Sequence, residues 1–121
     1  MDAQQRISDL IGFCRGLPHV EEDIKWDCNR VFMIGGKMFC VFAVDQSVAV
    51  KASFKVDDHR FLEFTDRPQF IPAPYLARAR WVGLVDLDGL AQAELTDLIR
   101  HSYRHYFGKL TKKRQRELGG E

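Results

Sequence analysis

Residues 31–54, VFMIGGKMFCVFAVDQSVAVKASF, decide the fold of this chain. Three short apolar runs are separated by a Gly-Gly pair at 35–36 and an Asp-Gln-Ser triplet at 45–47. This pattern is typical of consecutive β-hairpins, because glycine tolerates the positive φ that tight primed turns need. The middle run, 38–44, is apolar on both pleat faces and predicts a central strand. The third run, 47–54, alternates and predicts a strand with one wetter face. We therefore predict a β-meander.

The composition fits one globular domain. The chain has 121 residues, of which 45% are hydrophobic, which is enough for a core and too little for two domains. A single domain over 1–121 is therefore expected. The net charge of +1 is unevenly distributed, since residues 1–66 carry 8 basic and 11 acidic side chains, whereas residues 67–121 carry 10 and 6. The basic half is the C-terminal one, and this distribution matters more than the sum.

The cysteine pattern and the hydropathy of the sequence indicate which cellular compartment to expect. Cys14, Cys28 and Cys40 are an odd number without a C-x-x-C pair, which predicts free thiols in a reducing environment, with Cys28 the most exposed. Nowhere do about 18 apolar residues follow one another without interruption. We therefore expect a cytoplasmic protein without membrane anchorage.

Helices are expected on both sides of the meander. Apolar residues recur at helical spacing over 2–16, where Asp2 can serve as N-cap, and over 91–107, where Gly108 follows the last turn. A shorter helix is expected after Asp57.

The remaining segments complete the predicted sheet. Residues 24–26 favour an edge strand, and residues 80–87 have strand character and are expected to pair with the meander. Three prolines predict an ordered surface loop over 68–80 in place of a regular element. The predicted fold is α+β, with an antiparallel sheet of four or five strands packed against N-terminal and C-terminal helices.

The order of these features resembles the MmcQ/YjbR family of small bacterial proteins. The resemblance is carried by LPHVEED at 17–23, VFMIGGKMFCVF at 31–42, Pro74-Tyr75 with Arg80-Trp81-Val82 before VDLDG at 85–89, and HSYRHYFGKLTKK at 101–113. It covers nearly the whole chain, and the order and spacing are more specific than any single motif. It implies a fold similar to that of the bacterial frataxin CyaY, also compared to a double-wing DNA-binding module, and it implies no established enzyme activity.

Nucleic-acid binding, with DNA as the partner, is the leading functional hypothesis. Five cations fall within residues 109–116 without an intervening acid, and phosphate contacts need such mobile cations on one face. The alternative is that this basic segment is a solvated helix end whose charge complements the negative end of the preceding helix. The residues assigned to nucleic-acid contact are Arg78, Arg80, Lys109, Lys112 and Lys113, with Lys37 and Lys51 on the sheet as secondary contacts and Trp81 as a base-stacking residue. The alternative to a base-stacking role for Trp81 is a position in the hydrophobic core.

A frataxin-like carrier of a metal or small ligand is an alternative class. Hard cations need clustered carboxylates, but the first helix offers only Asp2 and Asp9, and the other nearby acids fall within 21–27. His101 and His105 stand four apart on the last predicted helix, yet two ligands leave a zinc site incomplete. We therefore assign no metal site and no cofactor.

A protein-interaction module is the third class. The 68–80 loop carries apolar side chains among its prolines, and these either meet a partner or cover an edge of the core. No G-x-S-x-G elbow is present, and the Gly-Gly-Lys stretch at 35–37 is too short for a phosphate-binding loop. We assign no catalytic residue, expect no enzyme activity, and favour a monomer.

Overall fold

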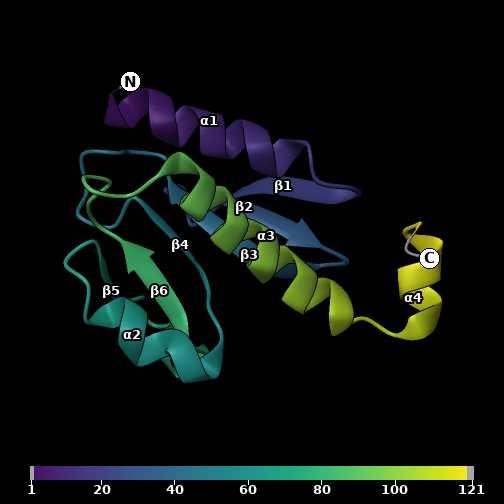
Figure 1. Cartoon of the computed structure of the whole chain (residues 1–121). Helices are drawn as coiled ribbons and strands as arrows, with labels where there is room; N and C mark the ends of the chain where they lie inside the picture. The colour runs from purple at the N-terminus through teal and green to yellow at the C-terminus, as the bar shows by residue number, and fades with distance from the viewer. Residues whose placement is uncertain (1, 120–121) are drawn as a thin grey trace.

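Six strands form one antiparallel sheet within residues 2–119, the part of the chain that the computed structural model describes (Figure 1). In chain order the elements are α1 (Ala3–Arg15), β1 (Val20–Lys25), β2 (Asn29–Ile34), β3 (Lys37–Ala43), β4 (Ala52–Lys55), the 3-10 helix η1 (Asp58–Arg60), α2 (Phe61–Thr65), β5 (Phe70–Pro72), the 3-10 helix η2 (Ala77–Ala79), β6 (Trp81–Leu84), α3 (Gln92–Gly108) and α4 (Lys112–Glu117). The strand order is β1-β2-β3-β4-β6-β5. The predicted α+β class is confirmed, and the sheet has more strands than the four or five expected.

The double-glycine turn between β2 and β3 is confirmed. Gly35 and Gly36 have φ values of 57° and 81°, which a side chain with a Cβ rarely adopts. The turn sets the register of the hairpin, in which Ile34 pairs with Lys37 and Val31 pairs with Val41. β2 and β3 occupy inner positions of the sheet, as their apolar sequences require.

The third strand of the meander is shorter than predicted. The Asp45 carboxylate accepts hydrogen bonds from the Ser47 amide and hydroxyl at 2.9 and 2.6 Å, and the Gln46 amide donates to the carbonyls of Ala43 and Lys51 at 2.7 and 3.0 Å. These local bonds turn the chain, because Asx turns compete with a strand ladder. β4 therefore keeps only four residues, and all four are buried, so the expected wetter face is not observed.

The edges of the sheet are β1 and β5. β1 pairs with β2 over its six residues, so the predicted edge strand is present, but it runs over 20–25 and Trp26 lies in the turn that follows it. β5 lies within the 68–80 segment that was predicted as a loop, and it pairs with β6 from Phe70 to Pro72. Proline is tolerated at an edge because its missing N–H faces away from the ladder. The prediction of a loop over this whole segment was wrong.

All the main helices pack on one face of the sheet. In Figure 1, α1 and α3 cross the same face of the strands. Asp2 caps α1 by accepting a hydrogen bond from the Gln5 amide at 2.7 Å, as predicted. The core between these layers contains Leu10 of α1, Phe42 and Phe54 of the sheet and Leu95 of α3. No helix within residues 2–119 is long and apolar enough to cross a bilayer.

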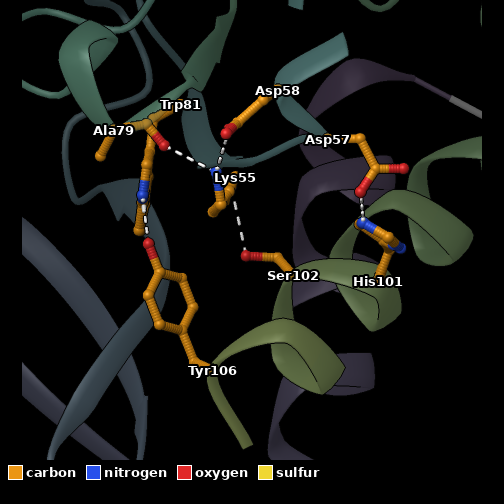
Figure 2. A network of polar contacts seen from close by, with 8 residues as sticks. All are labelled: Lys55, Asp57, Asp58, Ala79, Trp81, His101, Ser102 and Tyr106. Atoms are coloured by element: carbon orange, nitrogen blue, oxygen red, sulfur yellow. Dashed lines mark hydrogen bonds and ion pairs between the residues drawn. The ribbon is translucent and has the colours of Figure 1, made fainter. Parts of the chain in front are cut away.

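A buried hydroxyl joins α3 to two strands. The Ser102 hydroxyl donates to the Phe39 carbonyl at 2.6 Å and accepts from the Lys55 amide at 3.2 Å; the latter bond is drawn in Figure 2. The β3–β4 pairing reaches only to Cys40 and Phe54 at this end of the sheet. Ser102 therefore bridges the two strands at the point where they separate.

Candidate functional site

Six exposed cations gather around the β2–β3 turn, and we call this surface the basic end: Lys37, Lys109, Lys112, Lys113, Arg114 and Arg116. The turn and the C-terminal segment are in contact, because a Cβ added to Gly35 would lie 2.8 Å from the Leu110 methyl groups. A Cβ added to Gly119 would lie 3.0 Å from His19 Nε2. The α4 helix therefore extends from the hairpin toward the turn before β1.

The α4 helix is held in place by an N-cap residue and by one leucine at each of its ends. Thr111 caps the helix by accepting a hydrogen bond from the Arg114 amide at 3.1 Å. The Gln115 side chain donates to the Leu110 carbonyl at 2.9 Å. Leu110 and Leu118 pack against the core, so the basic residues between them are held on a docked helix and do not extend from a free tail.

The charges of the basic end are not neutralised by neighbours. In the described part of the chain, carboxylates pair with cations located elsewhere: Arg15, Arg30, Lys55, Arg60, Arg67 and Arg100. Within the same residues, none of the six cations of the basic end makes an ion pair. The surface therefore carries an excess of positive charge, which Glu117 of α4 offsets only in part.

Arg78 and Arg80 lie apart from this cluster. Arg80 directly precedes β6, whose first residue pairs with Lys55 of β4, so it lies at the same end of the sheet as Lys37 but two strands away. Its guanidinium lies 5.5 Å from the centre of the Phe61 ring. It is also close enough to Asp58 to help lower the pKa of that carboxyl, after the larger effect of Lys55. Both arginines are exposed, and Arg80 has the carboxylate of Asp58 nearby.

Two of the predicted contact residues are not available as proposed. Trp81 is 2% exposed, and its indole N–H donates to the Tyr106 hydroxyl at 2.8 Å (Figure 2). A buried ring cannot stack on a base, so its core position is the correct alternative. Lys51 lies in the turn before β4 and donates from Nζ to the carbonyls of Gln46 and Val48. Its amide donates to Leu84, which places it at the sheet end opposite to Lys37.

A polar network at the sheet–α3 junction has a structural role. Lys55 Nζ donates to Asp58 Oδ1 at 3.0 Å and to the Ala79 carbonyl at 2.9 Å, and His101 Nε2 lies 2.8 Å from Asp57 Oδ1 (Figure 2). These bonds join η1, η2 and α3. They satisfy a nearly buried ammonium, which is costly to leave unpaired.

The two histidines of α3 do not converge. His101 pairs with Asp57, whereas the His105 ring packs edge-on against Tyr106 with 4.8 Å between ring centres. Burial, followed by nearby Lys55, lowers the pKa of His105. No group of three or more His, Cys, Asp or Glu residues within 2–119 is arranged to hold a metal ion.

The cysteines are placed as predicted. Cys14 and Cys40 are buried and Cys28 is exposed, and all three are free. Burial, and then a contact with Cys14, raises the pKa of the Cys40 thiol well above its ordinary value. A protonated buried thiol is a poor nucleophile.

The structure also contains an apolar groove that no pattern in the sequence indicated, and we call it the sheet groove. It has a volume of about 890 Å³ and is lined by strand and loop residues that include Trp26, Met38, Val41, Asp45, Val48 and Tyr75. These residues are distant in the sequence and share no motif. Only the three-dimensional arrangement reveals that they surround one hollow.

Comparisons with known proteins agree with one another. A family model described as YjbR matches residues 15–105. The crystal structure of a Deinococcus radiodurans protein with a DUF419 domain is 31% identical, with a TM-score of 0.81, and the match covers 93% of this chain and 87% of that one. A Pseudomonas syringae protein shares the fold at 17% identity and a TM-score of 0.66, over 87% of this chain and 98% of that one. No curated protein matches the chain.

Proposed function

The chain belongs to the YjbR family, and from the surface that its fold presents we propose that the protein binds DNA through the basic end. The observation that carries the proposal is the gathering of six exposed cations, unpaired within residues 2–119, on and around α4. Elsewhere in the described chain, six lysines and arginines pair with carboxylates, while the exposed Arg78, Arg80 and Arg104 make no ion pair and do not belong to the basic end. A DNA backbone would supply the missing negative charge.

The proposed contact is to phosphates and not to bases. Lysine and arginine side chains on an exposed helix reach phosphate oxygens without reading sequence. Trp81 is buried and cannot serve as the base-stacking residue. We therefore propose binding with little sequence preference, in which Arg78 and Arg80 extend the contact when the DNA is long enough to reach them. The resemblance to a double-wing DNA-binding module favours the same class of partner.

Single-residue variants test the proposal. Each phosphate contact is worth about tenfold in affinity at 50 mM salt. We expect Lys113→Gln to weaken binding of a fluorescein-labelled 20-base-pair duplex by about that factor in an anisotropy titration. Glutamine is a good helix former and leaves α4 intact.

The matched control is Lys25→Gln, which makes the same charge change at the other end of the sheet. Lys25 pairs with Asn29 across β1 and β2, whereas Lys37 pairs with Ile34 at the opposite end of β2. The control should bind as the unchanged protein does. Equal effects of the two variants would mean that only net charge matters, and no binding of duplex or single-stranded DNA at 50 mM salt would reject the proposal in favour of a solvated basic helix.

A protein partner at the 68–80 segment is a second candidate. Tyr75 is fully exposed and Ile71 is 37% exposed, whereas Phe70 of the same segment is in the core. A pulldown in which Tyr75→Ala abolishes a retained protein would support it. In both cases the proposed activity is binding without a catalytic step, in a reducing cytoplasm where the exposed Cys28 stays a free thiol.

A further inference from the structure

The sheet groove lies on the face of the sheet that the helices leave uncovered. Cross-strand pairing places Val41, Ser53 and Gly83 in one row, and this row alternates with the core residues that face α1 and α3 (Figure 1). Val41 and Ser53 line the groove, and in the described part of the chain no helical residue does. The groove is therefore separate from the helical layer and from α4.

Two loops form the walls of the groove. Residues 44–51 return over the sheet, and a Cβ added to Gly83 would lie 3.0 Å from Val50 Cγ1. Glycine at this position therefore lets the loop approach the sheet closely. Residues 74–76 contribute another part of the wall. The volume of about 890 Å³ lies within the range of small-molecule sites, which is about 300–1,000 Å³.

Two exposed aromatic residues line the groove in a strained backbone conformation. Trp26 is 68% exposed with a φ of 55°, and Tyr75 is fully exposed with a φ of 66°. Large side chains rarely adopt positive φ, and strain of this kind concentrates at functional sites. If backbone conformation alone determined the residue at these two turns, glycine or asparagine would be expected there.

The charge of the lining restricts the ligand. Asp45 is the one charged residue among those lining the groove in the described chain, and no lysine or arginine lines it. Hydrogen bonds from Ser47 lower the pKa of Asp45, so its carboxylate is ionised at neutral pH. Nearby Lys51 also lowers the pKa of Asp45, but its ammonium donates to the carbonyls of Gln46 and Val48 and does not line the groove. The lining itself therefore offers no cationic partner to fatty acids, nucleotides or other anions, in contrast to the basic end.

We propose that the sheet groove binds a hydrophobic organic cation, an amine or quaternary ammonium with an aromatic or alkyl body. The apolar floor, which includes Met38 and Val41, contacts the body. The cationic group is attracted by the Asp45 carboxylate and by the faces of Trp26 and Tyr75, because aromatic rings attract ammonium groups. A second copy of the chain is a poorer occupant, since two concave faces related by a two-fold axis would enclose a void.

A matched series of probes tests the proposal on the full chain. 4-Phenylbutylamine, 4-phenylbutanol and 4-phenylbutyrate share one apolar body and differ in charge. We expect amide NMR shifts at groove residues for the amine, with a Kd of about a few millimolar for a ligand of this size. The alcohol should bind more weakly and the carboxylate weakest. Asp45→Asn retains the Asx turn and should weaken the amine about fivefold while leaving the alcohol unchanged.

Variants of the two aromatic residues separate a ligand site from a structural role. Tyr75→Asn and Trp26→Asn should each weaken amine binding at least threefold while Tm stays constant or rises, because asparagine tolerates positive φ. Leu62→Asn is the matched control, since Leu62 is 79% exposed and lies on α2. The proposal is overturned by equal or tighter binding of the carboxylate, by shifts outside the groove only, by no shifts with any probe, or by a Tm that falls in both aromatic variants without loss of binding.

Discussion

The buried hydroxyl of Ser102 bonds to two strands at once, and Ser102→Ala removes both bonds without adding bulk. The Phe39 carbonyl loses its 2.6 Å donor and the Lys55 amide loses its 3.2 Å acceptor. Ser102 is fully buried, so we expect no water to replace the hydroxyl. Each orphaned buried group costs about 1–3 kcal/mol.

The combined loss is expected to be about 3 kcal/mol. A domain of this length has a free energy of unfolding of about 6–18 kcal/mol, so the variant should still fold. Since 1 kcal/mol shifts Tm by about 3–5 °C at this size, Tm should fall by about 10 °C. Urea unfolding should show a lower midpoint at an unchanged m-value, because the surface exposed on unfolding is the same.

The matched control is Ser53→Ala, at the other buried serine of the described chain. Ser53 faces the sheet groove, and we expect a change within about 0.5 kcal/mol. If Ser102→Ala and Ser53→Ala had the same small effect, the bridge between α3 and the diverging strands would not contribute to stability as argued.

Three further predictions concern the hairpin, acid stability and the thiols. Gly35→Ala should destabilise the protein by about 1–3 kcal/mol in urea unfolding, since φ is positive there and the added Cβ meets Leu110; an unchanged midpoint would contradict this contact. A hydrogen bond from Arg15 is the largest cause lowering the pKa of Glu22 to about 2. The ionised Glu22 therefore contributes about 1–2 kcal/mol to the free energy of unfolding above its unfolded pKa, and this contribution is lost as pH falls from about 4.5 toward 2. Glu22→Gln should make the free energy of unfolding less dependent on pH over that interval, and an unaltered pH profile would refute the argument. A thiol reagent should label Cys28 in the folded protein and the two buried cysteines only after unfolding; rapid labelling of all three would disprove their burial.

The central hairpin was predictable because its signals are local. An apolar run on either side of two glycines admits few alternatives, and both glycines have the positive φ that the turn requires. The helix caps at Asp2 and Thr111 were predictable for the same reason, since one side chain bonds to an amide three residues away.

The segment 44–51 was not predictable from periodicity. Its alternating valines fit a strand, but the side chains of Asp45 and Gln46 bond to nearby backbone groups and turn the chain instead. Val48 and Val50 consequently line the groove and do not extend β4. A short polar run thus outweighed a pattern of apolar residues, as Asx turns allow.

The candidate sites were predictable only in part. The cations of 109–116 could be recognised as a cluster, but their juxtaposition with Lys37 depends on Leu110 packing over Gly35, a contact between residues far apart in the sequence. Trp81 is buried at the sheet–helix interface, where its indole N–H donates to the Tyr106 hydroxyl, a partner 25 residues away in the sequence. The sheet groove has no signal in the sequence, because its residues come from three turns and three strands.

The salt dependence of DNA binding tests the central claim most directly. The basic end offers six cations, so four to six phosphate contacts predict a slope of about −3.5 to −5.5 for log K against log salt. Between 50 and 200 mM salt the affinity of the labelled duplex should then fall by about 100- to 2,000-fold. A slope weaker than about −1, or the same slope after Lys113→Gln, would contradict binding through this surface.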